Sequence, residues 1–211
     1  MINKDTDIYC SFSSNPGNSG CTYFNSIFKE KNINAIYKSF YSNNILDSLK
    51  AVKSLGIKGF AVSMPFKVEI VQYLEDLDST ALSVGAVNTI LNNDGHLTGY
   101  NTDYLAAKEV LDECLCIDLY ILGDGGYSLA VQQASKDLGY VPNIITRDTW
   151  NNIKNIQNSI IFNCTPVENI QVNDSNKFID CITSTETGKR LSSIQASHQL
   201  KLYLGENYEW Y

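Results

Sequence analysis

The stretch Gly-Phe-Ala-Val-Ser-Met at residues 59–64 constrains the fold most, because it is apolar on both faces. Strands of this kind lie inside parallel sheets, between two layers of helices. Apolar runs at residues 8–12 and 35–40 indicate two further strands, and apolar residues at helical spacing follow at residues 23–28 and 45–55. This alternation of strand and helix predicts an α/β fold with a mostly parallel, αβα first domain.

Short polar residues and glycines mark where these elements end. Asn18 or Ser19 is placed to cap the first helix, and Asn44 to cap the second, which Gly56 then stops. The sequence Asn92-Asn93-Asp94-Gly95 lies between apolar runs at residues 86–91 and 97–100, which predicts a tight hairpin.

The composition indicates a globular protein that acts on a small molecule. The 211 residues are 44% hydrophobic and 18% charged, and the net charge of −7 disfavours a nucleic-acid surface. The N-terminus lacks a basic segment followed by an apolar core, and no apolar run approaches about eighteen residues. We therefore expect a cytoplasmic monomer or homodimer with a small-molecule partner and no nucleic-acid or membrane partner.

The six cysteines predict neither disulfides nor a metal site. They stand at positions 10, 21, 114, 116, 164 and 181, without a C-x-x-C pair, and only two histidines accompany them. We expect buried free thiols and no bound metal.

Ser63-Met64-Pro65-Phe66-Lys67 closes the apolar strand and opens a helix that we expect to continue to Leu77. Ligands of α/β proteins bind at the carboxyl ends of such strands. A lysine in the first turn of a helix meets the positive end of the helix dipole, so its presence favours a functional role. The alternative is a surface lysine that extends into water.

Three motifs of this region resemble the signature of the shikimate dehydrogenase family. They are Val62-Ser63-Met64-Pro65-Phe66-Lys67, Gly85-Ala86-Val87-Asn88-Thr89 and Asn101-Thr102-Asp103. Pro16-Gly17-Asn18 resembles the shikimate 5-dehydrogenase-like branch. The resemblance implies a substrate domain at residues 1–103, a shortened Rossmann-type NADP-binding domain at 104–188, and a C-terminal helix at 189–211 that returns to the first domain.

The resemblance also implies reversible, NADPH-dependent reduction of 3-dehydroshikimate to shikimate, or of a related polyol acid such as quinate. Lys67 would exchange the proton, with Asp103 holding the reacting hydroxyl; Asp103 would otherwise be only a helix cap. The substrate contacts implied are Ser11, Ser19, Ser63, Asn88 and Gln195, although Ser11 and Ser19 equally fit a solvated turn.

A glycine turn at residues 123–126 lies between an apolar strand at 118–122 and a helix that runs to residue 138. Glycines in this place let the backbone approach a pyrophosphate, although Asp124 adds a negative charge beside it. Arg147 matches the position that selects NADP, while Asp148 leaves NAD possible. The cofactor-binding residues we expect are Gly123, Gly125, Gly126, Tyr127, Ser128, Thr146, Arg147 and Thr165.

Several departures from the family pattern leave two functions open. Glu168-Asn169 stands where the family has Gly-Met beside the nicotinamide, Ala61 replaces a frequent Asn, and a helix and loop before Gly188 are missing. The chain is then either a dehydrogenase or a binding protein descended from one. The retained Lys67 and Asp103 favour the enzyme.

Overall fold

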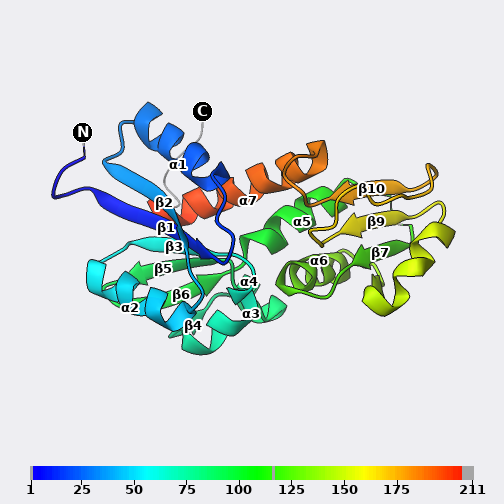
Figure 1. Cartoon of the computed structure of the whole chain (residues 1–211), viewed down its shortest axis with the longest axis horizontal. Coiled ribbons are helices and arrows are strands. Elements are labelled where there is room, and N and C mark those ends of the chain that lie inside the picture. The colour runs from blue at the N-terminus through cyan, green and yellow to red at the C-terminus, as the bar shows by residue number, and fades with distance from the viewer. Residues whose placement is uncertain (1, 116, 206–211) are drawn as a thin grey trace. The chain divides into compact units, whose positions relative to one another are not determined.

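The computed structural model describes residues 2–115 and 117–205, which divide into two compact units. The first unit comprises the described residues up to Thr102 together with those from Ala196 onward, and the second is Asp103–Gln195. Both units contain a sheet with parallel strands and packed helices, so the predicted α/β class is confirmed (Figure 1).

The first unit is built on a six-stranded sheet in the order β2-β1-β3-β5-β6-β4. Its strands are β1 (Asp7–Ser13), β2 (Ala35–Tyr41), β3 (Gly59–Val62), β4 (Asp76–Leu77), β5 (Thr89–Asn93) and β6 (His96–Tyr100). β1 pairs in parallel with β2 and β3, and β4 with β6, whereas β5 is antiparallel to both β3 and β6. The sheet is therefore mostly parallel, as predicted.

Helices cover both faces of this sheet (Figure 1). They are α1 (Ser19–Glu30), α2 (Ile45–Leu55), α3 (Phe66–Glu69), the 3₁₀ helix η1 (Ile70–Tyr73), α4 (Ser79–Val84) and the end of α7 (Glu186–Leu204). Tyr9 of β1 packs with α1 and α7 on one face, while its neighbour Cys10 packs with α2, α3 and α4 on the other. Successive side chains of this one strand therefore contribute to two separate hydrophobic cores.

The local signals at α2 and at the hairpin act as predicted. The Asn44 side chain accepts hydrogen bonds from the backbone amides of Leu46 and Asp47, and Gly56 ends the helix with φ of 62°. Asp94 and Gly95 both have positive φ, 51° and 96°, between the antiparallel strands β5 and β6. Asn18 stands at the N-cap of α1, but its side chain makes no capping bond.

The helix predicted from Phe66 to Leu77 is wrong. α3 ends at Glu69, η1 ends at Tyr73, and Asp76–Leu77 forms β4, which pairs with Thr98 and Gly99 of β6. A Cβ on Gly99 would lie 2.6 Å from Leu74 Cδ1 and 3.1 Å from Leu77 Cδ2, so Gly99 leaves the space these leucines fill. Tertiary packing therefore overrides the helical spacing.

The second unit holds an all-parallel sheet in the order β10-β9-β7-β8. Its elements are α5 (Thr102–Asp112, whose first residue belongs to the other unit), β7 (Leu119–Leu122), α6 (Gly126–Asp137), β8 (Asn143–Ile145), the 3₁₀ helix η2 (Arg147–Asn155), β9 (Ile160–Asn163), β10 (Lys177–Asp180) and the start of α7. Leu122 and Ile161 pack with η2 on one face, whereas Phe162 packs on Tyr127 of α6, with ring centroids 6.4 Å apart.

Three other expectations need correction. Asp103 lies inside α5 rather than capping it, and α7 begins at Glu186, earlier than the helix expected from residue 189. The described cysteines are thiols, as expected, but only Cys10 is buried; Cys21, Cys114, Cys164 and Cys181 are partly exposed. Cys116 and the tail at residues 206–211 lie outside the described residues.

Within the described ranges, no helix combines the length and apolar character needed to cross a bilayer.

Candidate active site

The turn after β3 carries the candidate catalytic lysine. The Ser63 amide donates to Phe12 O at 3.1 Å, and the Ser14 amide donates to Met64 O at 3.3 Å, so this turn is tied to the carboxyl end of β1. Met64-Pro65 is a cis peptide, and Phe66 and Lys67 open α3. Ser63 is exposed and Lys67 half-buried. α3 is only four residues long, so the dipole argument for Lys67 is weaker than the sequence suggests.

The backbone of Lys67 also holds the second motif in place. The Val87 amide donates to Lys67 O at 2.8 Å, and the Val62 amide donates to Asn88 O at 2.9 Å. The motif that contains Lys67 and the motif that contains Asn88 are therefore joined by backbone hydrogen bonds within one unit.

Asn88 is only 4% exposed and is held by its neighbours. Its Nδ2 donates to Thr102 Oγ1 at 2.9 Å, and its Oδ1 accepts from the Thr102 amide at 2.8 Å and from Thr89 Oγ1 at 2.9 Å. Asn88 therefore fixes the start of α5, a role that the sequence motif alone did not reveal.

Asp103 is the residue after Thr102 and the first acidic residue of α5. A carboxylate in the first turn of a helix is favoured by the positive end of the helix dipole, which offsets the cost of its burial at 6% exposure. The bonds between Asn88 and Thr102 hold the residue directly before it.

The two serines expected to contact substrate differ in their surroundings. Ser11 Oγ donates to Ser39 Oγ at 3.1 Å, and Cys21 Sγ donates to the same Ser39 oxygen at 3.3 Å. Ser19 is exposed at the first position of α1. Ser11 therefore belongs to a polar cluster of the first unit. Ser19 faces solvent, which fits the alternative interpretation of this segment as a solvated turn.

Gln195 is half-buried on α7, in the second unit. Gln199, one helical turn later, is buried in the first unit and donates from Nε2 to Thr89 Oγ1 at 3.0 Å. We had not singled out Gln199; its position four residues after Gln195, on the same helical face, was the available signal.

The strand order of the second unit points to a ligand crevice beside the glycine turn. From β7 the chain adds β8 on one side and then β9 on the other, so the direction of strand addition reverses between β7 and β9. Open parallel sheets bind ligands at the carboxyl ends of the strands at such a reversal. β7 ends at Leu122 and β9 at Asn163, directly before Gly123 and Cys164.

The glycine turn has the geometry that a pyrophosphate site needs. Gly123 has φ of 100°, and a Cβ on it would lie 2.8 Å from Thr165 Cγ2. Gly125 is the N-cap of α6, a twelve-residue helix, and a Cβ there would meet no atom within 4 Å; the N-terminus of such a helix favours a phosphate. Asp124 is exposed. The residues present therefore fit a dinucleotide phosphate.

The neighbours of the glycine turn have different roles. Ser128 is fully buried and donates from Oγ to Gly123 O at 2.7 Å, so it braces the turn. Tyr127 is half-buried; desolvation, followed by the nearby Asp103 carboxylate, raises the pKa of its phenol well above the ordinary value. Its hydroxyl is therefore a neutral hydrogen-bond donor at neutral pH.

The end of β8 is tied to the same turn. The Gly123 amide donates to Ile145 O at 2.8 Å, and Thr146 follows as the N-cap of η2. The Thr146 amide donates to Thr149 Oγ1 at 3.0 Å. Arg147 and Asp148 are both exposed in the first turn of η2, so the structure leaves both side chains available.

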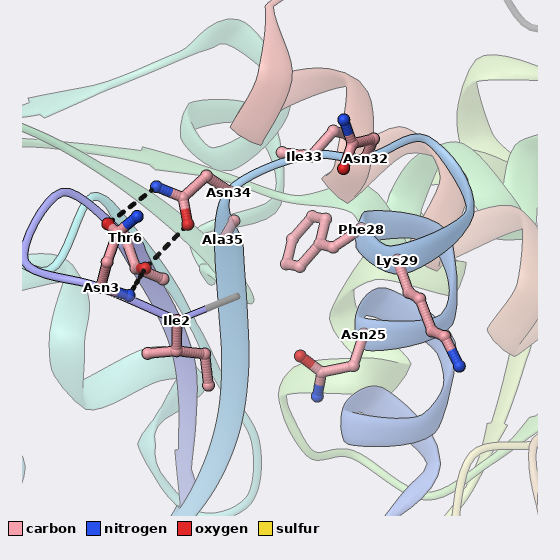
Figure 2. Close-up of a pocket in the computed structure, with 10 residues that line it drawn as sticks. All are labelled: Ile2, Asn3, Thr6, Asn25, Phe28, Lys29, Asn32, Ile33, Asn34 and Ala35. Carbon is pink, nitrogen blue, oxygen red and sulfur yellow. Dashed lines mark hydrogen bonds between the residues drawn. The ribbon is translucent and has the colours of Figure 1, made fainter.

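A cavity of about 630 Å³ lies elsewhere, at the amino ends of β1 and β2 (Figure 2). Figure 2 shows Thr6, Asn34 and Asn3 bonded to one another along one side, with Thr6 Oγ1 to Asn34 Oδ1 at 2.8 Å and Asn34 Nδ2 to Asn3 Oδ1 at 3.2 Å. Because ligands of α/β sheets bind at carboxyl ends, this cavity is not the candidate site. No group of three metal-ligating side chains occurs within residues 2–115 and 117–205.

Comparisons with known proteins find chains of similar sequence and fold. Residues 19–90 match the shikimate dehydrogenase substrate binding domain. A shikimate dehydrogenase-like protein of Haemophilus influenzae is 38% identical over 143 residues, 66% of this chain and 53% of that protein. The NADP(+) shikimate dehydrogenase of Pyrococcus furiosus is 34% identical over 151 residues, 69% and 54% of the two chains.

A solved shikimate 5-dehydrogenase-like protein superposes with a TM-score of 0.81 and 29% identity, covering 96% of this chain and 93% of that one. The chain spans about half the length of the curated relatives it matches.

Proposed function

Because this chain belongs to the shikimate dehydrogenase family, we propose that it is an NADP-dependent oxidoreductase. It interconverts 3-dehydroshikimate and shikimate, or a related polyol acid such as quinate. The observation that supports the proposal most is the hydrogen bond from the Val87 amide to Lys67 O. This bond joins the turn that carries Lys67 to the residues directly before β5, which include Asn88. The first unit binds the substrate, and the second binds the cofactor.

Lys67 and Asp103 handle the proton. During reduction the Lys67 ammonium gives a proton to the carbonyl oxygen of the substrate, and during oxidation its neutral amine takes the proton back. The Asp103 carboxylate accepts a hydrogen bond from the same hydroxyl and keeps it oriented. Ser63 and Gln195 contact the remaining polar groups of the substrate, with Ser11 and Ser19 toward its carboxylate. NADPH supplies the hydride when bound.

The second unit holds the dinucleotide. The amides at Gly125 and Gly126 bind the pyrophosphate at the start of α6, and Gly123 lets Thr165 approach the turn closely. Arg147 binds the 2′-phosphate that distinguishes NADP from NAD. The Pyrococcus furiosus relative is an NADP(+) enzyme, which supports this choice. Asp148, adjacent and exposed, is the feature that favours NAD instead.

A second candidate function is binding without turnover. Glu168 and Asn169 are exposed on the loop after β9, and Asn169 has φ of 56°. This loop stands where the family places Gly-Met against the nicotinamide. An altered loop would leave the substrate side intact while hydride transfer fails.

One assay separates the two functions. Shikimate mixed with NADP should raise the absorbance of reduced nicotinamide, and Lys67→Ala should lower the rate at least about a hundredfold. Lys58→Ala is the matched control, because Lys58 is exposed just before the amino end of β3 and should leave the rate unchanged. Shikimate binding without turnover with either NADP or NAD would support the binding protein and contradict the enzyme.

A further inference from the structure

Asp180 is a buried carboxylate that takes no part in the proposed reaction. It ends β10 and is only 6% exposed. Its Oδ1 accepts hydrogen bonds from Asn163 Nδ2 at 3.0 Å and from the Ile182 amide at 3.0 Å. Burial of a carboxylate is costly, so its retention here suggests a task that a neutral residue performs less well.

Asn163, the partner of Asp180, shapes the bend that follows β9. It is fully buried, and its Oδ1 accepts from the Thr165 amide at 2.9 Å and from Thr165 Oγ1 at 2.7 Å. Its Nδ2 donates to Val167 O at 3.2 Å as well as to Asp180. One amide side chain thus binds both ends of the bend at residues 164–167.

The carboxylate acts together with two backbone groups, the Thr165 amide and Val167 O, to fix which way this amide points. An ionised carboxylate only accepts hydrogen bonds, so the NH₂ group of Asn163 must face Asp180 and its oxygen must face Thr165. A flipped amide would place oxygen against oxygen at Asp180 and NH₂ against the Thr165 amide. Hydrogen bonds to a charged acceptor are about twice as strong as neutral ones, which reinforces the choice.

The bend fixed in this way lies against the glycine turn. Thr165 Cγ2 is 2.8 Å from the place where a Cβ on Gly123 would stand, and the Cys164 amide donates to Leu122 O at 2.9 Å. Gly123 therefore leaves open the space beside it that the Thr165 side chain needs. The contacts therefore run from Asp180 through Asn163 and Thr165 to the turn that borders the crevice.

We propose that Asp180 is a positioning residue, which orients Asn163 and thereby sets the conformation of residues 164–167 for dinucleotide binding. The cofactor part of this inference rests on the proposed function. Asp180 touches neither substrate nor cofactor in this role. Its contribution is to cofactor affinity, and substrate affinity in the first unit is independent of it.

Three variants of the full chain test the proposal. Asp180→Ala removes the acceptor, Asp180→Asn keeps a neutral acceptor oxygen, and Asp174→Ala removes an exposed acid from the segment that leads into β10. Calorimetric titration with NADP should show dissociation constants raised about tenfold or more in Asp180→Ala, partly restored in Asp180→Asn and unchanged in Asp174→Ala. Shikimate affinity should be the same in all three.

Hydrogen exchange at the Thr165 amide supplies a readout that needs no ligand. Protection should fall in Asp180→Ala and persist in Asp174→Ala, because only the first change releases Asn163. Unaltered exchange, or equal NADP affinity in wild type and Asp180→Ala, would overturn the positioning role alone. A wild-type chain that binds neither NADP nor NAD would overturn the cofactor part together with the proposed function.

Discussion

Asn88 and Thr102 are held together by hydrogen bonds in both directions: Asn88 Nδ2 donates to Thr102 Oγ1 at 2.9 Å, and the Thr102 amide donates to Asn88 Oδ1 at 2.8 Å. The entry to β5 therefore fixes the first residue of α5, directly before Asp103. A residue that the family motif presents as a ligand contact is also a structural brace.

Replacing Asn88 with Ala should destabilise the chain because it leaves the buried Thr102 amide without its acceptor. We expect the free energy of unfolding to fall by about 1–3 kcal/mol in a urea titration. Asn93→Ala, an exposed change at the far end of the same strand, is the control and should fall within about 0.5 kcal/mol of wild type. Equal stabilities of the two variants would contradict the brace.

Tyr203→Phe should stabilise the chain. Tyr203 Oη is buried and has no hydrogen-bond partner in the part of the chain that the structure describes. Removing an unsatisfied buried hydroxyl should raise the free energy of unfolding by about 1 kcal/mol. Tyr9, whose ring centroid is 4.6 Å from that of Tyr203, donates from its own hydroxyl to Tyr203 O at 2.9 Å. Tyr9→Phe should therefore destabilise, and a shift of the same sign in both variants would be evidence against this difference.

Gly188→Ala should be severely destabilising. Gly188 is buried near the start of α7, and a Cβ there would overlap the backbone carbonyl of Ile182. Backbone cannot move aside as a flexible side chain can, so the melting experiment should show a loss of about 3 kcal/mol or more. In Gly125→Ala the new Cβ meets no atom within 4 Å, so the loss should be only about 1 kcal/mol, because alanine is a poorer N-cap for α6 than glycine. A Gly188→Ala protein as stable as this control would refute the close approach.

Arg147→Ala should separate the two nicotinamide cofactors. Arg147 is exposed at the start of η2, after the strand whose end is tied to Gly123. Loss of a charged contact to the 2′-phosphate should raise the Michaelis constant for NADP about tenfold and leave that for NAD nearly unchanged. Steady-state kinetics with both cofactors measures this, and equal effects on the two would defeat the assignment.

Elements with strong local signals were predictable from the sequence. Asn44 and Gly56 bound α2 through contacts within a few residues, and Asp94-Gly95 adopts the positive φ angles that a tight hairpin needs. The strand that ends before Ser63 was predictable because a run that is apolar on both faces fits the interior of a parallel sheet.

The errors arose where distant residues decide the structure. Residues 70–77 have helical spacing, but Gly99 offers space for Leu74 and Leu77, and β6 pairs with Asp76–Leu77. Likewise, the partners of Ser11 and Asn163 are Ser39 and Asp180, which are remote in sequence. No local pattern reveals such pairings.

Transfer of deuterium from NADPH, labelled at the transferable position of its nicotinamide, to 3-dehydroshikimate tests most directly whether the chain is a dehydrogenase. We predict that mass spectrometry will find shikimate carrying the deuterium with wild type and with Lys58→Ala, and far less of it with Lys67→Ala. Wild-type protein that binds both ligands and yields no labelled shikimate would contradict hydride transfer.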